Sequence, residues 1–181
     1  MIDCVPFFMN LVEKFKLVST FILDVDGVLT DGTVYVFESG EQVRRMSIRD
    51  GYALQLAIKK RYRVLVISGG ESPAVESRLR KLGIIDIFMN VTDKKAVVLE
   101  YIQNHGLRRE ETLFMGDDIP DYSAMKEAGL PVAPADAAQE IKKISVYIAS
   151  NKGGKGCVRE VMEKVLRLNG HWELETHIAS R

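Results

Sequence analysis

Two patterns of apolar residues alternate along most of this chain. Short runs of consecutive apolar residues predict buried strands, and the stretches between them carry apolar residues at helical spacing. The predicted strands are residues 21–23, 63–67, 85–89, 112–115, 129–132 and 146–149. The predicted helices are residues 50–61, 73–82, 94–105, a helix starting at 119, 136–143 and 157–168. Strands that alternate with helices indicate an α/β domain with a mostly parallel sheet flanked by helices.

One segment departs from this alternation. Residues 33–48 contain two β-rich arms around Ser39-Gly40, which predicts a protruding β-hairpin after the first strand. Its apolar positions are Val34, Val36, Val43 and Met46. Because a lone hairpin is only marginally stable in water, we expect it to pack either on this core or on another subunit.

The length of the chain, 181 residues, suits one domain with a substantial core. We expect that domain to span residues 19–168 and to be Rossmann-like. Residues 1–18 form a leading helical segment, with an amphipathic helix predicted over residues 6–16. Residues 169–181 form a tail without a clear pattern, for which disorder is one expectation.

Composition and charge narrow the function. Lys plus Arg and Asp plus Glu both number 25, so the formal net charge is zero, which argues against a broad nucleic-acid or anionic-membrane surface. Cys4 and Cys157 are the only cysteines, and their spacing does not suit a metal site. They are typical of reduced thiols in a cytoplasmic protein. No apolar run approaches membrane-spanning length.

Acidic residues follow directly after the first predicted strand. Asp24 and Asp26 are two residues apart, so on a regular strand they share a face, where each raises the pKa of the other unless a cation lies between them. A hard metal ion is the simplest such cation. Gly27 and Gly32 allow a tight turn that brings N–H groups close to an anion. This stretch therefore predicts a phosphate site beside a metal ion, with Asp31 ordering the turn.

Two further strand ends carry polar residues. In parallel sheets, ligands bind beyond the carboxyl ends of the strands. Here those ends also hold Ser68-Gly69-Gly70 and Gly116-Asp117-Asp118, and we expect them to converge with Asp24 on one crevice. Lys94, which begins the next helix, is expected to join them. Oxygen ligands without a nearby His or Cys favour Mg²⁺.

This set of residues suits phosphoryl transfer. A carboxylate can attack phosphorus as a nucleophile, while a second carboxyl group moves the proton. Cations and backbone N–H groups neutralise the phosphoryl charge. Two alternatives stay open: Asp24 and Asp26 could instead form a helix cap or a Ca²⁺ turn, and Lys95 competes with Lys94.

Four motifs, D-V-D-G-V-L-T-D-G, I-S-G-G, T-D-K-K and G-D-D-I-P-D, occur in this order within residues 20–168. Together they resemble the motifs of the haloacid dehalogenase superfamily of phosphohydrolases. The resemblance implies that Asp24 is the nucleophile, that Asp26 is the general acid and base, and that Ser68 and Lys94 bind phosphate. It also implies that Mg²⁺ is held by Asp24, the carbonyl of Asp26, and Asp117, with Asp118 or Asp121 behind them.

The gaps between these motifs are too short for the cap domain that most members carry. S-I-R-D-G at residues 47–51 and G-G-K-G-C-V-R-E-V at residues 153–161 resemble the capless branch that includes 3-deoxy-D-manno-octulosonate 8-phosphate (KDO 8-phosphate) phosphatases. This implies a homotetramer with active sites at subunit interfaces, and a role in lipopolysaccharide synthesis. The substrate contacts that it implies, besides Asp26, Ser68 and Lys94, are Ser47, Arg49, Asp50, Gly51, Gly69, Arg78 and Lys155.

Two positions depart from that branch. Gly70 and Gln55 stand where the best-known KDO 8-phosphate phosphatases carry arginines thought to hold the sugar acid. Alternative substrates are therefore 2-keto-3-deoxynononate 9-phosphate, a sialic acid 9-phosphate or a general sugar phosphate. A receiver-like signalling domain is disfavoured, because a receiver lacks the acid/base represented here by Asp26. The alternatives to substrate contact are that Arg49 pairs within the hairpin and that Lys155 belongs to a flexible linker.

Overall fold

A computed structural model describes residues 10–173 and 176–178, and within them a six-stranded sheet forms the centre of the domain. The strand order is β5-β4-β1-β6-β7-β8, and every pairing is parallel. The strands are β1 (Thr20–Asp24), β4 (Arg63–Ile67), β5 (Asp86–Phe88), β6 (Thr112–Met115), β7 (Leu130–Ala133) and β8 (Tyr147–Ile148). The predicted α/β fold with a parallel sheet is confirmed.

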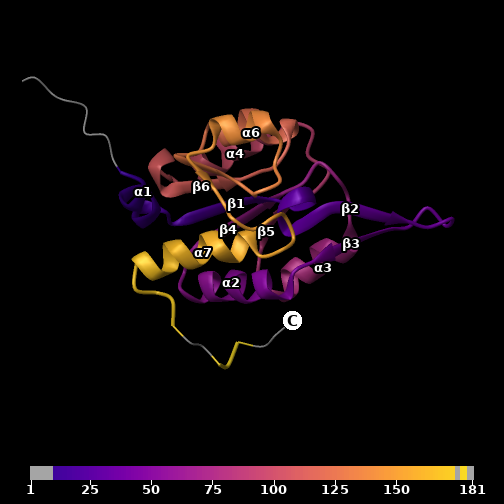
Figure 1. The fold of residues 1–181 in the computed structure, drawn as a ribbon, viewed down its shortest axis with the longest axis horizontal. Coiled ribbons are helices and arrows are strands. Elements are labelled where there is room, and N and C mark those ends of the chain that lie inside the picture. Colours follow the sequence, from indigo (N-terminus) through magenta and orange to yellow (C-terminus); the bar gives the residue numbers. More distant parts are fainter. Residues whose placement is uncertain (1–9, 174–175, 179–181) are drawn as a thin grey trace, which may run out of the picture.

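Helices cover both faces of this sheet (Figure 1). One side holds α2 (Ile48–Lys59), α3 (Pro73–Lys81) and α7 (Cys157–Leu168); the other holds α4 (Lys94–Asn104), α5 (Tyr122–Met125) and α6 (Gln139–Ile144). Successive residues of β1 point to opposite faces, so Phe21 and Leu23 join the first core while Ile22 joins the second. β1 is buried along its whole length, which explains its uninterrupted apolar run.

The hairpin consists of β2 (Thr30–Val36) and β3 (Gln42–Met46), which pair in antiparallel fashion and project away from the domain (Figure 1). Met46, at its base, packs against the core. Toward the tip, apolar side chains face solvent, with Tyr35 65% and Val36 69% exposed. The base of the hairpin therefore packs on this core, as one expectation had it. The tip leaves an apolar surface uncovered within one chain, which suits the other expectation, packing on another subunit.

Helix α2 begins two residues before the expected Asp50. Ser47 is its N-cap, because the Ser47 side chain accepts the backbone N–H of Asp50. The N-terminal helix α1 is Leu11–Leu17, and the earlier part of the predicted helix, like Cys4, lies outside the described residues. Cys157 is buried.

Part of the C-terminal tail contacts the domain. Trp172 packs edge-on against Tyr52, and the hydroxyl of Tyr62 bonds with Nδ1 of His171. The division of the chain into residues 1–18, 19–168 and 169–181 stays a prediction. Within the described ranges, no helix has both the length and the apolar character that crossing a bilayer requires.

Candidate active site

The carboxyl ends of β1, β4 and β6 open onto a hollow of about 380 Å³. Its lining residues are Asp24, Asp26, Gly32, Ser68, Gly69, Gly70, Val91, Thr92, Lys94, Asp117, Asp118, Pro120 and Asp121. The three strand ends that were expected to converge from the sequence do meet here, in agreement with the rule for ligand sites in parallel sheets. We call this hollow the crevice.

Asp24 is the last residue of β1, and the chain then turns tightly over Val25–Leu29, where Asp26 and Gly27 have non-helical dihedral angles. Gly27 lies in this turn with φ +88°, a conformation that favours glycine. A Cβ at Gly27 would overlap the carboxylate of Asp117. The glycine thus allows the β1 turn and the β6 end to approach closely, which brings their carboxylates together.

Lys94 connects two of these carboxylates. Its Nζ donates to Oδ1 of Asp24 at 2.7 Å and to Oδ1 of Asp121 at 2.6 Å, and all three side chains are buried. Although burial acts to lower the pKa of Lys94, the two carboxylates beside it raise that pKa above its ordinary value. Lys95 instead pairs with Glu127 near the surface. The geometry therefore places Lys94 in the crevice and leaves Lys95 outside it.

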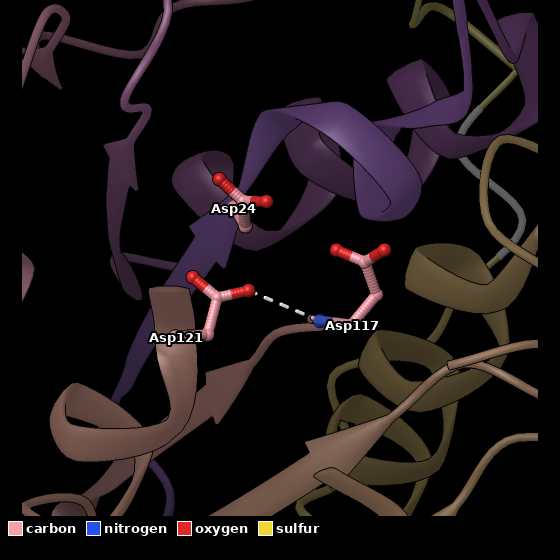
Figure 2. A group of neighbouring side chains, drawn as sticks. All are labelled: Asp24, Asp117 and Asp121. Carbon is pink, nitrogen blue, oxygen red and sulfur yellow. Dashed lines mark hydrogen bonds between the residues drawn. The ribbon is translucent and has the colours of Figure 1, made fainter. Parts of the chain in front are cut away.

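The crevice holds more buried negative charge than Lys94 can neutralise. Burial, followed by the charge of Asp121, raises the pKa of Asp24 to about 8. Burial and the charges of Asp121 and Asp118 raise the pKa of Asp117 to about 7. Oxygens of Asp24, Asp117 and Asp121 lie within 4.8 Å of one another. Figure 2 shows these three side chains gathered around one space. Such a group of carboxylates suits a hard divalent cation, which would favour their charged forms.

The hydrogen bonds distinguish a metal ligand from a supporting residue within this group. Asp121 Oδ2 accepts the backbone N–H of Asp117 at 3.1 Å, the bond drawn in Figure 2, and its Oδ1 accepts Lys94. Both Asp121 oxygens therefore have partners. Asp117 Oδ1 is buried without a hydrogen-bond partner, so it is suited to a cation. Asp118 is exposed, which leaves Asp121 as the residue that orients Asp117 and Lys94.

Ser68 and Asp26 complete the crevice. Ser68 is 2% exposed, and its Oγ accepts the N–H of Gly70 at 3.1 Å, which leaves the hydroxyl hydrogen to donate to an anion. The Asp26 side chain is 39% exposed, which leaves it open to solvent and to a substrate. Its carboxylate is bonded by Arg44 of β3. Sequence reasoning did not single out Arg44, because only the folding of the hairpin brings it to Asp26.

Several predicted substrate contacts lie outside the crevice within one chain. Ser47 caps α2, Gly51 is buried in that helix, and the buried Asp50 accepts the N–H of Arg159 at 2.8 Å. Arg49 and Lys155 line a separate hollow of about 580 Å³ beside α7. Arg78 lines a third hollow, described below. Their contact with substrate stays a prediction.

The raised carboxyl pKa values predict how pH affects the metal-free protein. In the folded protein, the pKa values of Asp24 and Asp117 lie well above 3.8, the ordinary value that applies in the unfolded chain. The folded state therefore holds more protons between about pH 4 and pH 8, and the free energy of unfolding should fall as pH rises through that window. Urea unfolding with a chelator present measures this, and Mg²⁺ should stabilise more at pH 8 than at pH 5.

The matched variant for this prediction is Asp117→Asn, which removes one of the two groups. It should flatten the dependence on pH relative to the unchanged protein. A metal-free protein that becomes steadily more stable from pH 4.5 to pH 8, with the same slope in Asp117→Asn, would contradict the assignment.

Comparison with known proteins places this geometry among phosphatases. Residues 70–161 match the haloacid dehalogenase-like hydrolase family. The 3-deoxy-D-manno-octulosonate 8-phosphate phosphatase KdsC of Escherichia coli strain K12 is 32% identical over 165 residues, which cover 91% of this chain and 88% of that protein.

Two solved structures show the same fold. One is the 3-deoxy-D-manno-octulosonate 8-phosphate phosphatase of Moraxella catarrhalis in complex with magnesium, phosphate and KDO; its TM-score is 0.84 at 30% identity, over 87% of this chain and 90% of that one. The other is the corresponding phosphatase of Yersinia pestis, with a TM-score of 0.86 at 31% identity, over 88% of this chain and 86% of that one.

Proposed function

This chain belongs to the haloacid dehalogenase-like hydrolase family, and from that premise we propose that it is a Mg²⁺-dependent phosphatase for KDO 8-phosphate. The predicted family is thereby confirmed. The observation that carries the proposal is the buried Asp24–Lys94 pair at the end of β1, bordered by Ser68 and by the unpartnered oxygen of Asp117. This arrangement combines a nucleophile, anion-binding groups and a cation site in one crevice.

In the proposed reaction, a carboxylate oxygen of Asp24 attacks phosphorus, and the bond from phosphorus to the sugar oxygen breaks. Asp26 gives that oxygen a proton, then removes one from a water molecule that attacks the aspartyl-phosphate. The attack releases phosphate and restores Asp24. Ser68 and Lys94 hold the phosphoryl oxygens throughout. Mg²⁺, held by Asp24, the Asp26 carbonyl and Asp117, would supply neutralising charge.

The substrate is inferred from named relatives, among them the Moraxella catarrhalis enzyme, whose crystal contains magnesium, phosphate and KDO. Gly70 and Gln55 leave two alternatives: a nine-carbon acid such as 2-keto-3-deoxynononate 9-phosphate or sialic acid 9-phosphate, and a general sugar phosphate. We expect kcat/KM with Mg²⁺ to be highest for KDO 8-phosphate, measured by phosphate release across such a panel. Preference for a nine-carbon acid would favour the first alternative, and preference for hexose phosphates would contradict the sugar-acid assignment.

Assembly into a homotetramer is the second part of the proposal. It is supported by the uncovered apolar side chains of the hairpin, Tyr35 and Val36 among them, and by the position of Arg49 and Lys155 outside the crevice. A neighbouring subunit would cover the apolar side chains of the hairpin, and the substrate bound in its crevice would meet Arg49 and Lys155. Light scattering should give the mass of four chains, and a stable monomer at assay concentration would contradict it. A cytoplasmic location stays a prediction that cell fractionation tests.

A further inference from the structure

Arg44 lies against the catalytic acid from the hairpin. Its Nε donates to Asp26 Oδ1 at 2.7 Å and its Nη2 to Asp26 Oδ2 at 3.2 Å. The Arg44 side chain is 8% exposed, whereas that of Asp26 is 39% exposed. Arg45, the next residue of β3, points the other way and pairs with Asp31. The hairpin therefore brings one specific guanidinium to Asp26, a residue that lines the crevice.

The space that Arg44 occupies is the space next to Gly70. A Cβ built on Gly70 would lie 3.3 Å from Arg44 Nη2, 3.5 Å from Asp26 Oδ2 and 3.7 Å from Ser68 Oγ. Gly70 does not adopt the left-handed conformation that favours glycine, so its backbone would accept another residue. What a side chain at position 70 would meet is the Arg44 guanidinium. An arginine at position 70 and Arg44 in its present place would thus compete for one region.

Arg44 also lines the third hollow. This space of about 250 Å³ lies between β3 and α3, and its lining includes Arg44, Arg78 and Glu41. Nε and Nη2 of Arg78 are buried without a hydrogen-bond partner. Buried guanidinium N–H groups without partners indicate a place for an acceptor, and a carboxylate matches the fork of an arginine. Arg44 therefore bonds the catalytic acid and also lines a hollow that holds the unpartnered donors of Arg78.

We propose that Arg44, which occupies the space beside Gly70, is a specificity-determining residue that binds the carboxylate of the sugar acid. The proposal rests on the proposed function, because it assumes an anionic sugar acid as the leaving group. Asp26 accepts two hydrogen bonds from the guanidinium, one from Nε and one from Nη2. The remaining N–H groups can hold a substrate carboxylate while the pair with Asp26 persists.

The test compares two phosphate esters on four proteins. The esters are KDO 8-phosphate and p-nitrophenyl phosphate, which lacks the carboxylate; the proteins are the unchanged chain, Arg44→Ala, Arg44→Ala with Gly70→Arg, and the control Arg45→Ala. We expect Arg44→Ala to lower kcat/KM for KDO 8-phosphate about 100-fold, mainly through KM, because a charge pair to the substrate is lost. For p-nitrophenyl phosphate the loss should stay below about fivefold.

Two further readouts separate recognition from structure. The double variant should regain at least about tenfold of the lost kcat/KM for KDO 8-phosphate, because the guanidinium returns from the other side of the same space. Calorimetry with free KDO should show weaker binding to Arg44→Ala than to Arg45→Ala, without any turnover. Arg45→Ala should keep the selectivity of the unchanged chain.

Each other outcome counts against a defined claim. Equal losses for both esters in Arg44→Ala, with no recovery in the double variant, would overturn the recognition role and leave Arg44 as a support for the hairpin. Selectivity that survives in Arg44→Ala would overturn it too. If the unchanged chain itself does not favour KDO 8-phosphate over p-nitrophenyl phosphate, the proposed substrate fails, and this role fails with it.

Discussion

Replacing Asp24 with Asn is expected to abolish phosphate release, with a fall in kcat of about a thousandfold or more. The amide has nearly the same shape as the carboxylate but cannot form the aspartyl-phosphate. Burial raises the pKa of Asp24 to about 8, so its charged form is costly there, and Lys94 keeps Asp121 as a partner in the variant; the fold should therefore survive the change. Phosphate release from KDO 8-phosphate under saturating Mg²⁺ measures the effect, and circular dichroism checks the fold.

The matched control is Asp31→Asn, at the start of β2. Asp31 pairs with Arg45 on the hairpin side and does not line the crevice. Its amide variant should keep kcat within about twofold, as surface changes usually do. If Asp24→Asn retained a substantial part of the activity while remaining folded, Asp24 would not be the nucleophile.

Replacing Lys94 with Met is expected to have the second largest effect, on both activity and stability. The variant keeps the aliphatic volume but leaves Asp24 and Asp121 without their shared cation. Loss of one partner from a buried ion pair costs about 3–5 kcal/mol. Loss of a charge that stabilises the transferring phosphoryl group costs about 10²–10³ in kcat. Urea unfolding and steady-state kinetics at pH 8 measure the two effects.

The cost in stability should shrink toward pH 5, where Asp24, whose pKa burial raises to about 8, accepts a proton and loses its charge. Lys95→Met, which removes only the surface pair with Glu127, serves as the control and should be nearly neutral. Equal behaviour of the two lysine variants would contradict the assignment of Lys94.

The sheet and its carboxylates could be predicted because both depend on local sequence. β1, β4 and β6 are buried runs that end in Asp24, Ser68 and Asp117, so hydrophobic pattern and motif spacing sufficed. The start of α2 was harder to predict, because Ser47 and Asp50 are both good N-cap residues and only the structure shows that Ser47 is the N-cap.

The local sequence could not show which residues contact partners that are distant in the sequence. Arg44 and Arg45 are adjacent and chemically identical in the sequence, yet one is buried against Asp26 and the other pairs with Asp31 on the surface. Which of them reaches the crevice depends on the face of β3 that turns inward. Asp118 or Asp121 was expected behind the metal ligands, and the bonds of Asp121 to the Asp117 N–H and to Lys94 favour Asp121.

The most direct test of the account is a crystal structure with Mg²⁺ and beryllofluoride, which mimics a phosphoryl group on a carboxylate. We expect beryllium bonded to a carboxylate oxygen of Asp24, with Ser68 and Lys94 on its fluorides and Mg²⁺ on Asp117. Beryllofluoride bonded to Asp26, or a crevice with Mg²⁺ held by Asp121 in place of Asp117, would contradict the division of roles among these carboxylates.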